Sequence, residues 1–226
     1  GAWRLASAVI NLVIVVLTLA AIAAAILAEP IVHYLLAPGF GPAAQALTVH
    51  LMRLLLIPPI IFAVSGVVMG ILYAHQSFWL PGLAPSMYNL GIIFGALVLV
   101  PFFDVYGLAL GAIIGALLHL LVQVPGLRRV KMQYTAHLAV RDPGVQEVVR
   151  LMMPRMFGVA VVQLNFLVVT SLASLLNTGA VSALNYAWRV MLVPQAVVAQ
   201  SVATAAFPTF ADQYARGQLP QLRSSL

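Results

Sequence analysis

The sequence predicts an all-α, polytopic membrane protein with six transmembrane helices. Three observations predict this class: the composition, the length of the apolar segments and the positions of the charges. Of the 226 residues, 63% are hydrophobic and only 7% are charged, against about 25% charged residues in an average soluble domain. The mean hydropathy is +1.05. This composition excludes a soluble enzyme, a nucleic-acid-binding domain and a disordered chain.

Six apolar segments are long enough to cross a membrane, for which a helix needs about 20 residues. They run over residues 3–27, 43–73, 83–103, 106–124, 156–176 and 180–207. Glu29 and Pro30 end the first segment, the turn 38–42 precedes the second, and Pro58 and Pro59 lie inside it. The runs are continuous and do not alternate with polar residues, so they predict helices and not the strands of a membrane barrel.

The charged residues support six helices and predict their orientation. If the helices alternate in direction, nine basic residues at the start of the first segment or outside the segments share one side of the membrane: Arg4, Arg128, Arg129, Lys131, Arg141, Arg150, Arg155, Arg216 and Arg223. The other side has Glu29 and Asp104 but no Lys or Arg outside the segments. Because basic residues gather in cytoplasmic loops, we expect both chain ends and the connection between the fourth and fifth helices in the cytoplasm. The net charge of +6 then reflects topology, and no nucleic-acid partner is expected.

The basic connection predicts a boundary between two helix bundles. Asp142 followed by Pro143 is typical of a helix start, with Asp as the N-cap and Pro at the first helical position. Four apolar residues then recur on one helix face, which predicts a short amphipathic helix at the membrane surface: Val145, Val148, Val149 and Met152. We therefore divide the chain into residues 1–126 with four spans, the connection 127–155, and residues 156–226 with two spans and a polar tail.

Glycines recur at four-residue spacing in three segments: Gly66 and Gly70, Gly91 and Gly95, and Gly107, Gly111 and Gly115. This spacing lets helix backbones approach closely in a membrane. It is compatible with helices that slide during a conformational change, but we expect ordinary close packing.

Arg189 is the strongest candidate for a functional residue, because a charged side chain inside a span costs at least about 2.5–3.5 kcal/mol. Three polar residues lie within about 60° of it around the helix, at 100° per residue: Ser182, Asn185 and Gln200. These four residues predict a polar stripe that lines a cavity and binds an anion. The alternatives are an arginine paired to a carbonyl or an acid inside a packed bundle and a side chain that extends outward to the membrane interface.

Arg53 is a second candidate, close to the predicted outer end of the second segment. A place in a cavity and extension of the side chain to the membrane interface are equally compatible with the pattern. Catalytic motifs such as His-Glu-x-x-His, a phosphate-binding glycine loop and Gly-x-Ser-x-Gly do not occur, so we expect a non-enzymatic protein with neither a cofactor nor a metal site.

The chain resembles the lipid II flippase family, MurJ/MviN, over essentially its whole length. The resemblance is carried by the order and spacing of several short patterns: Pro38 to Phe40, Arg53 to Pro59, Ser65-Gly66, Gly70 to Ala74, Phe78, Pro81, Pro85, Tyr88-Asn89, Gln163-x-Asn165, Ala173-Ser174, Gly179-x-x-Ser182, Tyr186-Ala187-x-Arg189, Pro194 and Ala206 to Pro208.

The resemblance implies six helices of a fourteen-helix, two-lobe transporter in the bacterial inner membrane. It implies that undecaprenyl-pyrophosphate-linked peptidoglycan precursor (lipid II) moves from the inner to the outer leaflet by alternating access. Arg189 and Ser182 match a cavity arginine and a cavity serine of the family. Trp188 departs from the pattern, because many members have an acid there. Membrane lipids and a coupling ion are the other partners to consider.

Two alternatives remain open. The first is a related exporter of the same superfamily that moves another polysaccharide-linked lipid or drugs, and the second is a membrane scaffold without transport. A drug–cation antiporter should carry an acid inside a span, and none lies deep in these six segments. Because the chain begins with Gly1 and not with Met, we expect a fragment of a larger transporter.

Overall fold

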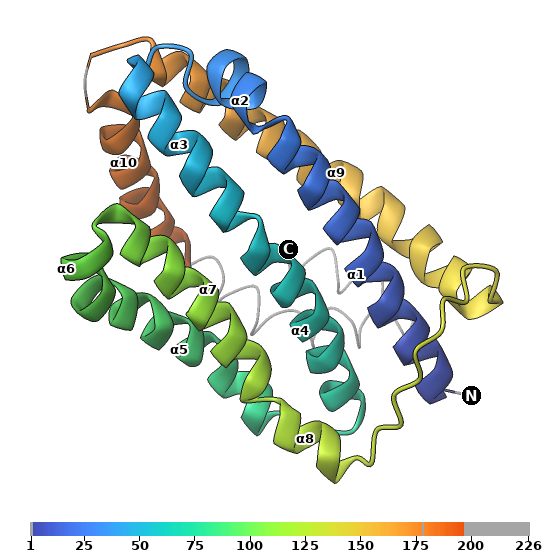
Figure 1. Cartoon of the computed structure of the whole chain (residues 1–226). Helices are drawn as coiled ribbons and strands as arrows, with labels where there is room; N and C mark the ends of the chain where they lie inside the picture. The colour runs from blue at the N-terminus through green and yellow to red at the C-terminus, as the bar shows by residue number, and fades with distance from the viewer. Residues whose placement is uncertain (1, 178, 197–226) are drawn as a thin grey trace, which may run out of the picture. The chain divides into compact units, whose positions relative to one another are not determined.

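The computed structural model describes residues 2–177 and 179–196, and every regular element in these ranges is a helix (Figure 1). The chain divides into two compact units, Gly1–Ser171 and Leu172–Leu226, which we describe separately. Five helical stretches are long and apolar enough to cross a membrane: Trp3–Ile26, Pro42–Ala74, Trp79–Phe103, Val105–Arg129 and Pro143–Ser174. The first five predicted spans are thereby confirmed. The sixth is described only as α10 (Ala180–Pro194), so the total of six stays a prediction.

Most spans of the first unit are interrupted helices. Their elements are α1 (Ala2–Ile26), α2 (Ala28–Pro30) and η1 (Ile31–Leu36); α3 (Pro42–Leu55) and α4 (Ile57–Ala74); α5 (Trp79–Phe94), η2 (Gly95–Leu99) and α6 (Val100–Phe103); and α7 (Val105–Leu121) and α8 (Val124–Arg129). Prolines explain two breaks, because proline lacks the N–H that a helix interior needs. Pro58 follows the break between α3 and α4, and Pro125 follows the break between α7 and α8.

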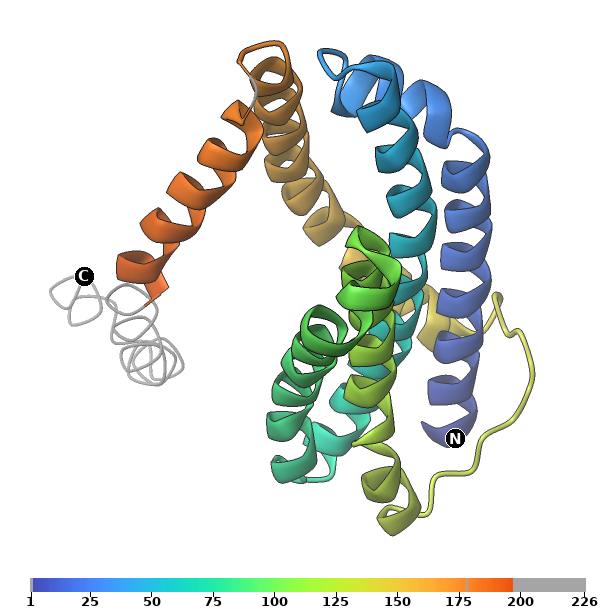
Figure 2. The ribbon, with the colours of Figure 1, turned by 60° about the vertical axis from the view of Figure 1, so that its left-hand side comes forward.

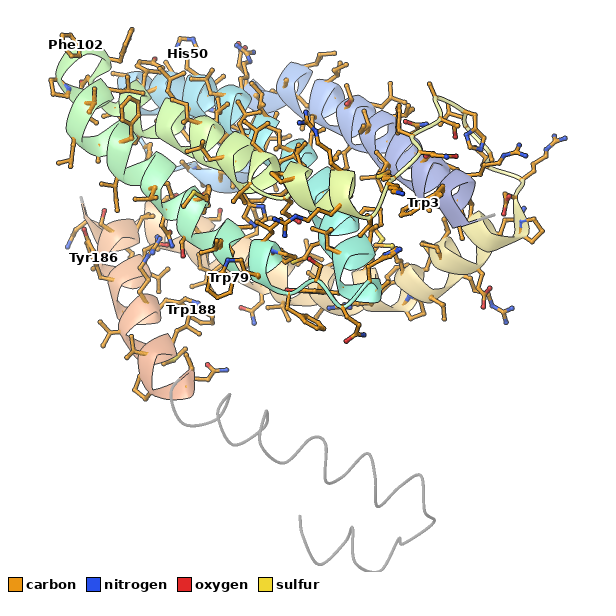
Figure 3. All side chains as sticks on the ribbon, turned by 90° about the horizontal axis from the view of Figure 1, so that it is seen from below. Trp3, His50, Trp79, Phe102, Tyr186 and Trp188 are labelled. Carbon is orange, nitrogen blue, oxygen red and sulfur yellow. The ribbon has the colours of Figure 1, made fainter. Side chains whose placement is uncertain are left out.

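The helices of the first unit alternate in direction, as the predicted topology requires. The rings of Trp3 and His75 stack at 5.4 Å, which joins the start of α1 to the end of α4. At the other end of the unit, Nδ1 of His50 lies 3.2 Å from the hydroxyl of Tyr106, which joins α3 to the start of α7. α4 packs between α1 and α7, and α7 packs on α5 (Figure 2). Figure 3 shows Trp3 far from His50 and Phe102, so aromatic rings mark both ends, as in proteins that span a bilayer.

Glycine contacts hold α5 and the following η2 against α7. A Cβ atom added to Gly91 would lie 2.2 Å from Cα of Gly115, and one added to Gly95 would lie 2.5 Å from Cα of Gly111. These two backbones therefore touch directly, in agreement with the expected close packing. Gly66 and Gly70 on α4 differ, since no atom lies within 4 Å of the Cβ that either would carry.

The connection between α8 and α9 (Pro143–Ser174) lies along α1. Asn11 donates its side-chain amide to the carbonyls of Thr135 and His137 and accepts a hydrogen bond from the hydroxyl of Tyr134. The backbone N–H of Thr135 donates to Oγ of Ser7, which is fully buried. Two polar residues of the first helix thus fix the middle of this connection.

α9 starts where the sequence predicts a helix. Oδ1 of Asp142 accepts a hydrogen bond of 2.8 Å from the backbone N–H of Gly144, and Pro143 is the first helical residue. The structure differs from the predicted short surface helix in one respect: the helix continues through Pro154 without a break. With 32 residues, α9 is about 48 Å long, whereas the hydrocarbon core is about 30 Å thick. One helix can therefore include both a segment outside the bilayer and a span.

Candidate functional site

The polar stripe of the sixth predicted span lies on α10. This helix begins after Gly179, whose φ of 94° is a left-handed conformation that glycine adopts without strain. Ser182 and Arg189 are exposed and Asn185 is half-buried. Nδ2 of Asn185 donates to the carbonyl of Val181 at 2.8 Å, so one hydrogen of this amide is already bonded within α10.

Arg189 lies on the described part of an apolar helix, and no carboxylate of residues 2–177 or 179–196 forms an ion pair with it. The preceding residue is Trp188, whose side chain is 45% exposed. A guanidinium in this setting can bind an anion with paired N–H groups. Gln200, the fourth residue of the predicted stripe, lies outside the described residues.

Arg53 lies at the end of the first unit where α1 stops, and α3 positions it there. Its Nε donates to the carbonyl of Ala25 at 3.1 Å, and one NH2 nitrogen lies 3.4 Å from Oε1 of Glu29. The last carbonyls of a helix lack partners and carry partial negative charge, so a cation stabilises them. Arg53 thus has a contact on α1 and one on α2, and the two candidate arginines lie in different units.

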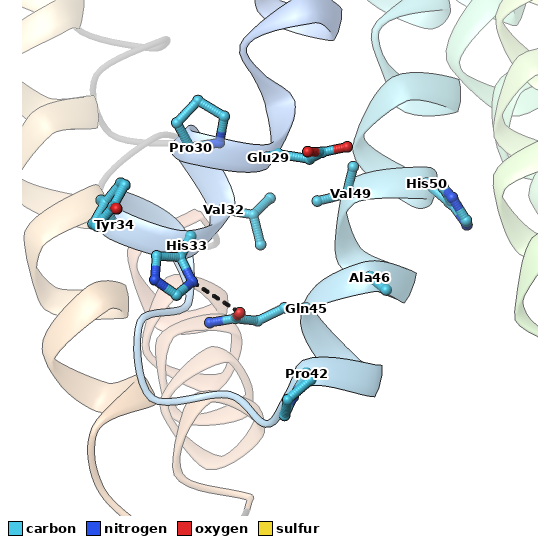
Figure 4. Close-up of a pocket in the computed structure, with 10 residues that line it drawn as sticks. All are labelled: Glu29, Pro30, Val32, His33, Tyr34, Pro42, Gln45, Ala46, Val49 and His50. Atoms are coloured by element: carbon cyan, nitrogen blue, oxygen red, sulfur yellow. Dashed lines mark hydrogen bonds between the residues drawn. The ribbon is translucent and has the colours of Figure 1, made fainter.

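A hollow of about 490 Å³ lies between η1 and α3 (Figure 4). Its polar side chains hold each other in place: Nδ1 of His33 lies 3.0 Å from Oε1 of Gln45, and Nε2 of Gln45 donates to the carbonyl of Ala37. Glu29 and His50 also line it. No three His, Asp or Glu side chains gather as a metal site here or elsewhere among the described residues.

Sequence reasoning missed a buried polar cluster between α4 and α7. Ser65 and Gln123 are fully buried and His119 is 9% exposed. Oγ of Ser65 lies 2.7 Å from Nδ1 of His119 and 2.6 Å from Nε2 of Gln123. The available signal was the spacing of His119 and Gln123, four residues apart and therefore on one helix face of an apolar segment.

The fold and these sites define a class: a polytopic, α-helical membrane protein with interrupted spans and single arginines on apolar helices. The model of the family described as "Lipid II flippase MurJ" matches residues 1–226. The chain belongs to this family.

Several curated relatives carry the same name. The chain is 35% identical over 191 residues to a lipid II flippase MurJ of Burkholderia cenocepacia, a match that covers 81% of this chain and 37% of the relative. It is 30% identical over 220 residues to a probable lipid II flippase MurJ of Bdellovibrio bacteriovorus, covering 96% of this chain and 42% of the relative. It is 32% identical over 166 residues to a probable lipid II flippase MurJ of Haemophilus influenzae, covering 73% and 32%. The chain thus spans well under half the length of these relatives.

Proposed function

We propose that this chain contributes its spans to a transporter that moves lipid II from the inner to the outer leaflet of the bacterial inner membrane by alternating access. The match of the family model to residues 1–226 carries the proposal. The interrupted spans of the first unit support it, because discontinuous helices are common in transporters that expose one site to each side of the membrane in turn.

Arg189 is the residue we propose to bind the precursor. Lipid II has a pyrophosphate, and an arginine fork pairs with phosphate oxygens through two charge-assisted hydrogen bonds. The exposed Ser182 and the half-buried Asn185 lie on the same side of α10 and supply neutral hydrogen-bond partners for a sugar headgroup. Gln200 completes the proposed stripe.

Arg53 has a lesser part in the proposed site. Two of its nitrogens, Nε and Nη2, already contact Ala25 and Glu29, which leaves Nη1 as the nitrogen that can bind a headgroup while these contacts hold. Its contacts support a role in fixing the end of α1.

Transport by the full-length protein in vesicles tests the role of Arg189. Arg189→Ala is expected to reduce leaflet transfer of labelled lipid II at least about tenfold, because a charge-assisted hydrogen bond is worth about 1.5–3 kcal/mol. Arg189→Lys keeps the charge without the fork and should retain part of the transfer. The matched control is Arg150→Ala, which removes an exposed arginine of α9. Transfer at the wild-type rate by Arg189→Ala contradicts the proposal.

We also propose that the basic end of the first unit faces the cytoplasm. The start of α1 and the end of α8 carry Arg4, Arg128 and Arg129, whereas Glu29 and Asp104 lie at the other end. The sequence has no cysteine, so single cysteines report accessibility without background. In intact cells, an impermeant maleimide should label Gly41→Cys and should label Arg129→Cys only after permeabilisation. The opposite pattern contradicts this orientation.

A further inference from the structure

The break between α7 and α8 lies inside the fourth span and depends on Gln123. The backbone N–H of Gln123 bonds to the carbonyl of Leu120, three residues back, and so leaves the carbonyl of His119 without its usual helical donor. The side chain replaces it, because Nε2 of Gln123 donates to that carbonyl at 2.9 Å. The carbonyl of Gln123 in turn accepts the N–H groups of Gly126 and Leu127 and so starts α8.

The neighbours of Gln123 fix the orientation of its amide. Nε2 has two hydrogens, and the carbonyl of His119 and Oγ of Ser65 accept one each. Turning the amide over would place its oxygen against the carbonyl of His119, which repels it. Ser65 accepts from Gln123 and can donate its own hydrogen to Nδ1 of His119, 2.7 Å away. The amide oxygen Oε1 must therefore point away from this cluster.

Oε1 of Gln123 is buried and accepts no hydrogen bond from the described residues. A buried carbonyl without a donor is unfavourable by about 1–3 kcal/mol. α4 and α7 contain no Lys, Arg, Asp or Glu, so neither helix offers a charged donor. A metal cation fits poorly, since hard cations take six or more oxygen ligands and only this one oxygen of the cluster is free.

The partner that Oε1 lacks must donate a hydrogen and must be small and uncharged, because this oxygen is buried between apolar helices. Water has these properties, and buried waters typically bridge polar groups that helices leave unpaired.

We propose that one ordered water molecule is bound at Oε1 of Gln123, and that this water together with Ser65, His119 and Gln123 holds the α7–α8 break against α4. The water donates a hydrogen to Oε1. The network makes an interrupted helix tolerable within the bilayer, where backbone groups cannot reach bulk solvent.

A structure of the full-length protein in lipid nanodiscs, at a resolution that shows ordered waters, tests the site directly. The expected result is a density peak about 2.6–3.2 Å from Oε1 of Gln123. A bare carbonyl overturns the proposal, and so does a donor from a side chain, a lipid or residues 197–226 in that position.

Thermal unfolding of the same protein gives a second readout. Gln123→Met keeps the side-chain length and removes the amide. If the amide is fully satisfied with its water, the midpoint should fall by about 2–6 °C. If Oε1 has no water, the substitution also removes a buried carbonyl without a donor, which by itself would raise the midpoint. A midpoint equal to or above that of the wild type therefore overturns the proposal. Gln146→Met on the exposed surface of α9 controls for the added apolar side chain.

Ser65→Ala keeps the test decisive if Gln123→Met fails to fold. This variant removes the two hydrogen bonds of the Ser65 hydroxyl and leaves Oε1 of Gln123 and Pro125 unchanged. The density peak at Oε1 should persist, and its loss in Ser65→Ala would contradict a water held by the helix break itself.

Discussion

Replacement of Gly91 by alanine should separate α5 from α7. The added Cβ would lie 2.2 Å from Cα of Gly115 and 2.4 Å from its N atom. Both are backbone atoms, so no side chain can rotate away to make room. Ordinary contact begins at 3.4 Å, and the two helices must therefore move apart by about 1.2 Å at this crossing.

The loss of stability in Gly91→Ala follows from this displacement. Inserting one carbon into a well-packed interior typically costs about 1–3 kcal/mol, and the contacts on both sides of the crossing are lost as the helices separate. Alanine has the higher helix propensity by about 1 kcal/mol, which offsets part of the loss. In a chain of this size, 1 kcal/mol shifts the melting temperature by about 2–4 °C, so we expect Gly91→Ala to melt roughly 2–8 °C lower.

The assay is thermal unfolding of the detergent-solubilised protein, followed by the fraction that remains monodisperse after heating. Gly66→Ala and Gly70→Ala are matched controls, since nothing lies within 4 Å of the added carbon at either position. Both should be as stable as the wild type or slightly more stable. If Gly91→Ala is as stable as Gly66→Ala, the direct backbone contact between α5 and α7 is refuted.

Two further predictions concern contacts at opposite ends of the first unit. Asn11→Ala removes the donor to the carbonyls of Thr135 and His137, so trypsin should cut the connection after Lys131 several times faster than in the wild type. Asn185→Ala is the control. Equal cleavage rates in Asn11→Ala and the wild type would contradict a role of Asn11 in holding the connection on α1. Arg53→Ala should lower the melting temperature by a few degrees, whereas Glu29→Gln should have little effect, because the bond from Arg53 to the carbonyl of Ala25 remains. If both variants lower the melting temperature equally, the ion pair with Glu29, and not the bond to the end of α1, stabilises the protein.

The spans could be predicted because continuous apolar length is a property of the chain alone. The five confirmed spans follow from it, as does the start of α9 at Asp142 and Pro143, where capping chemistry is local. The π-helical segments η1 and η2 could not be predicted, since their residues are as apolar as those of the neighbouring α-helices. Their positions depend on how the helices pack.

Contacts between different helices of the bundle could not be predicted from the sequence either. Ser65 bonds to residues more than fifty positions away, and Arg53 finds Glu29 on another element. Such pairs depend on how each helix is rotated about its axis. The stripe on α10 is different, because the 3.6-residue repeat alone places Ser182, Asn185 and Arg189 on one side. What that side binds stays a prediction.

The clamp of Asn11 on the connection limits how far α9 can travel from α1. Five residues, 138–142, separate His137 from the start of α9, and a fully extended chain of this length reaches about 17 Å. Without the clamp, the free tether would be residues 130–142, with a reach of about 45 Å. Asn11, with Ser7 beside it on α1, therefore shortens the free part of the connection that leads to the start of α9.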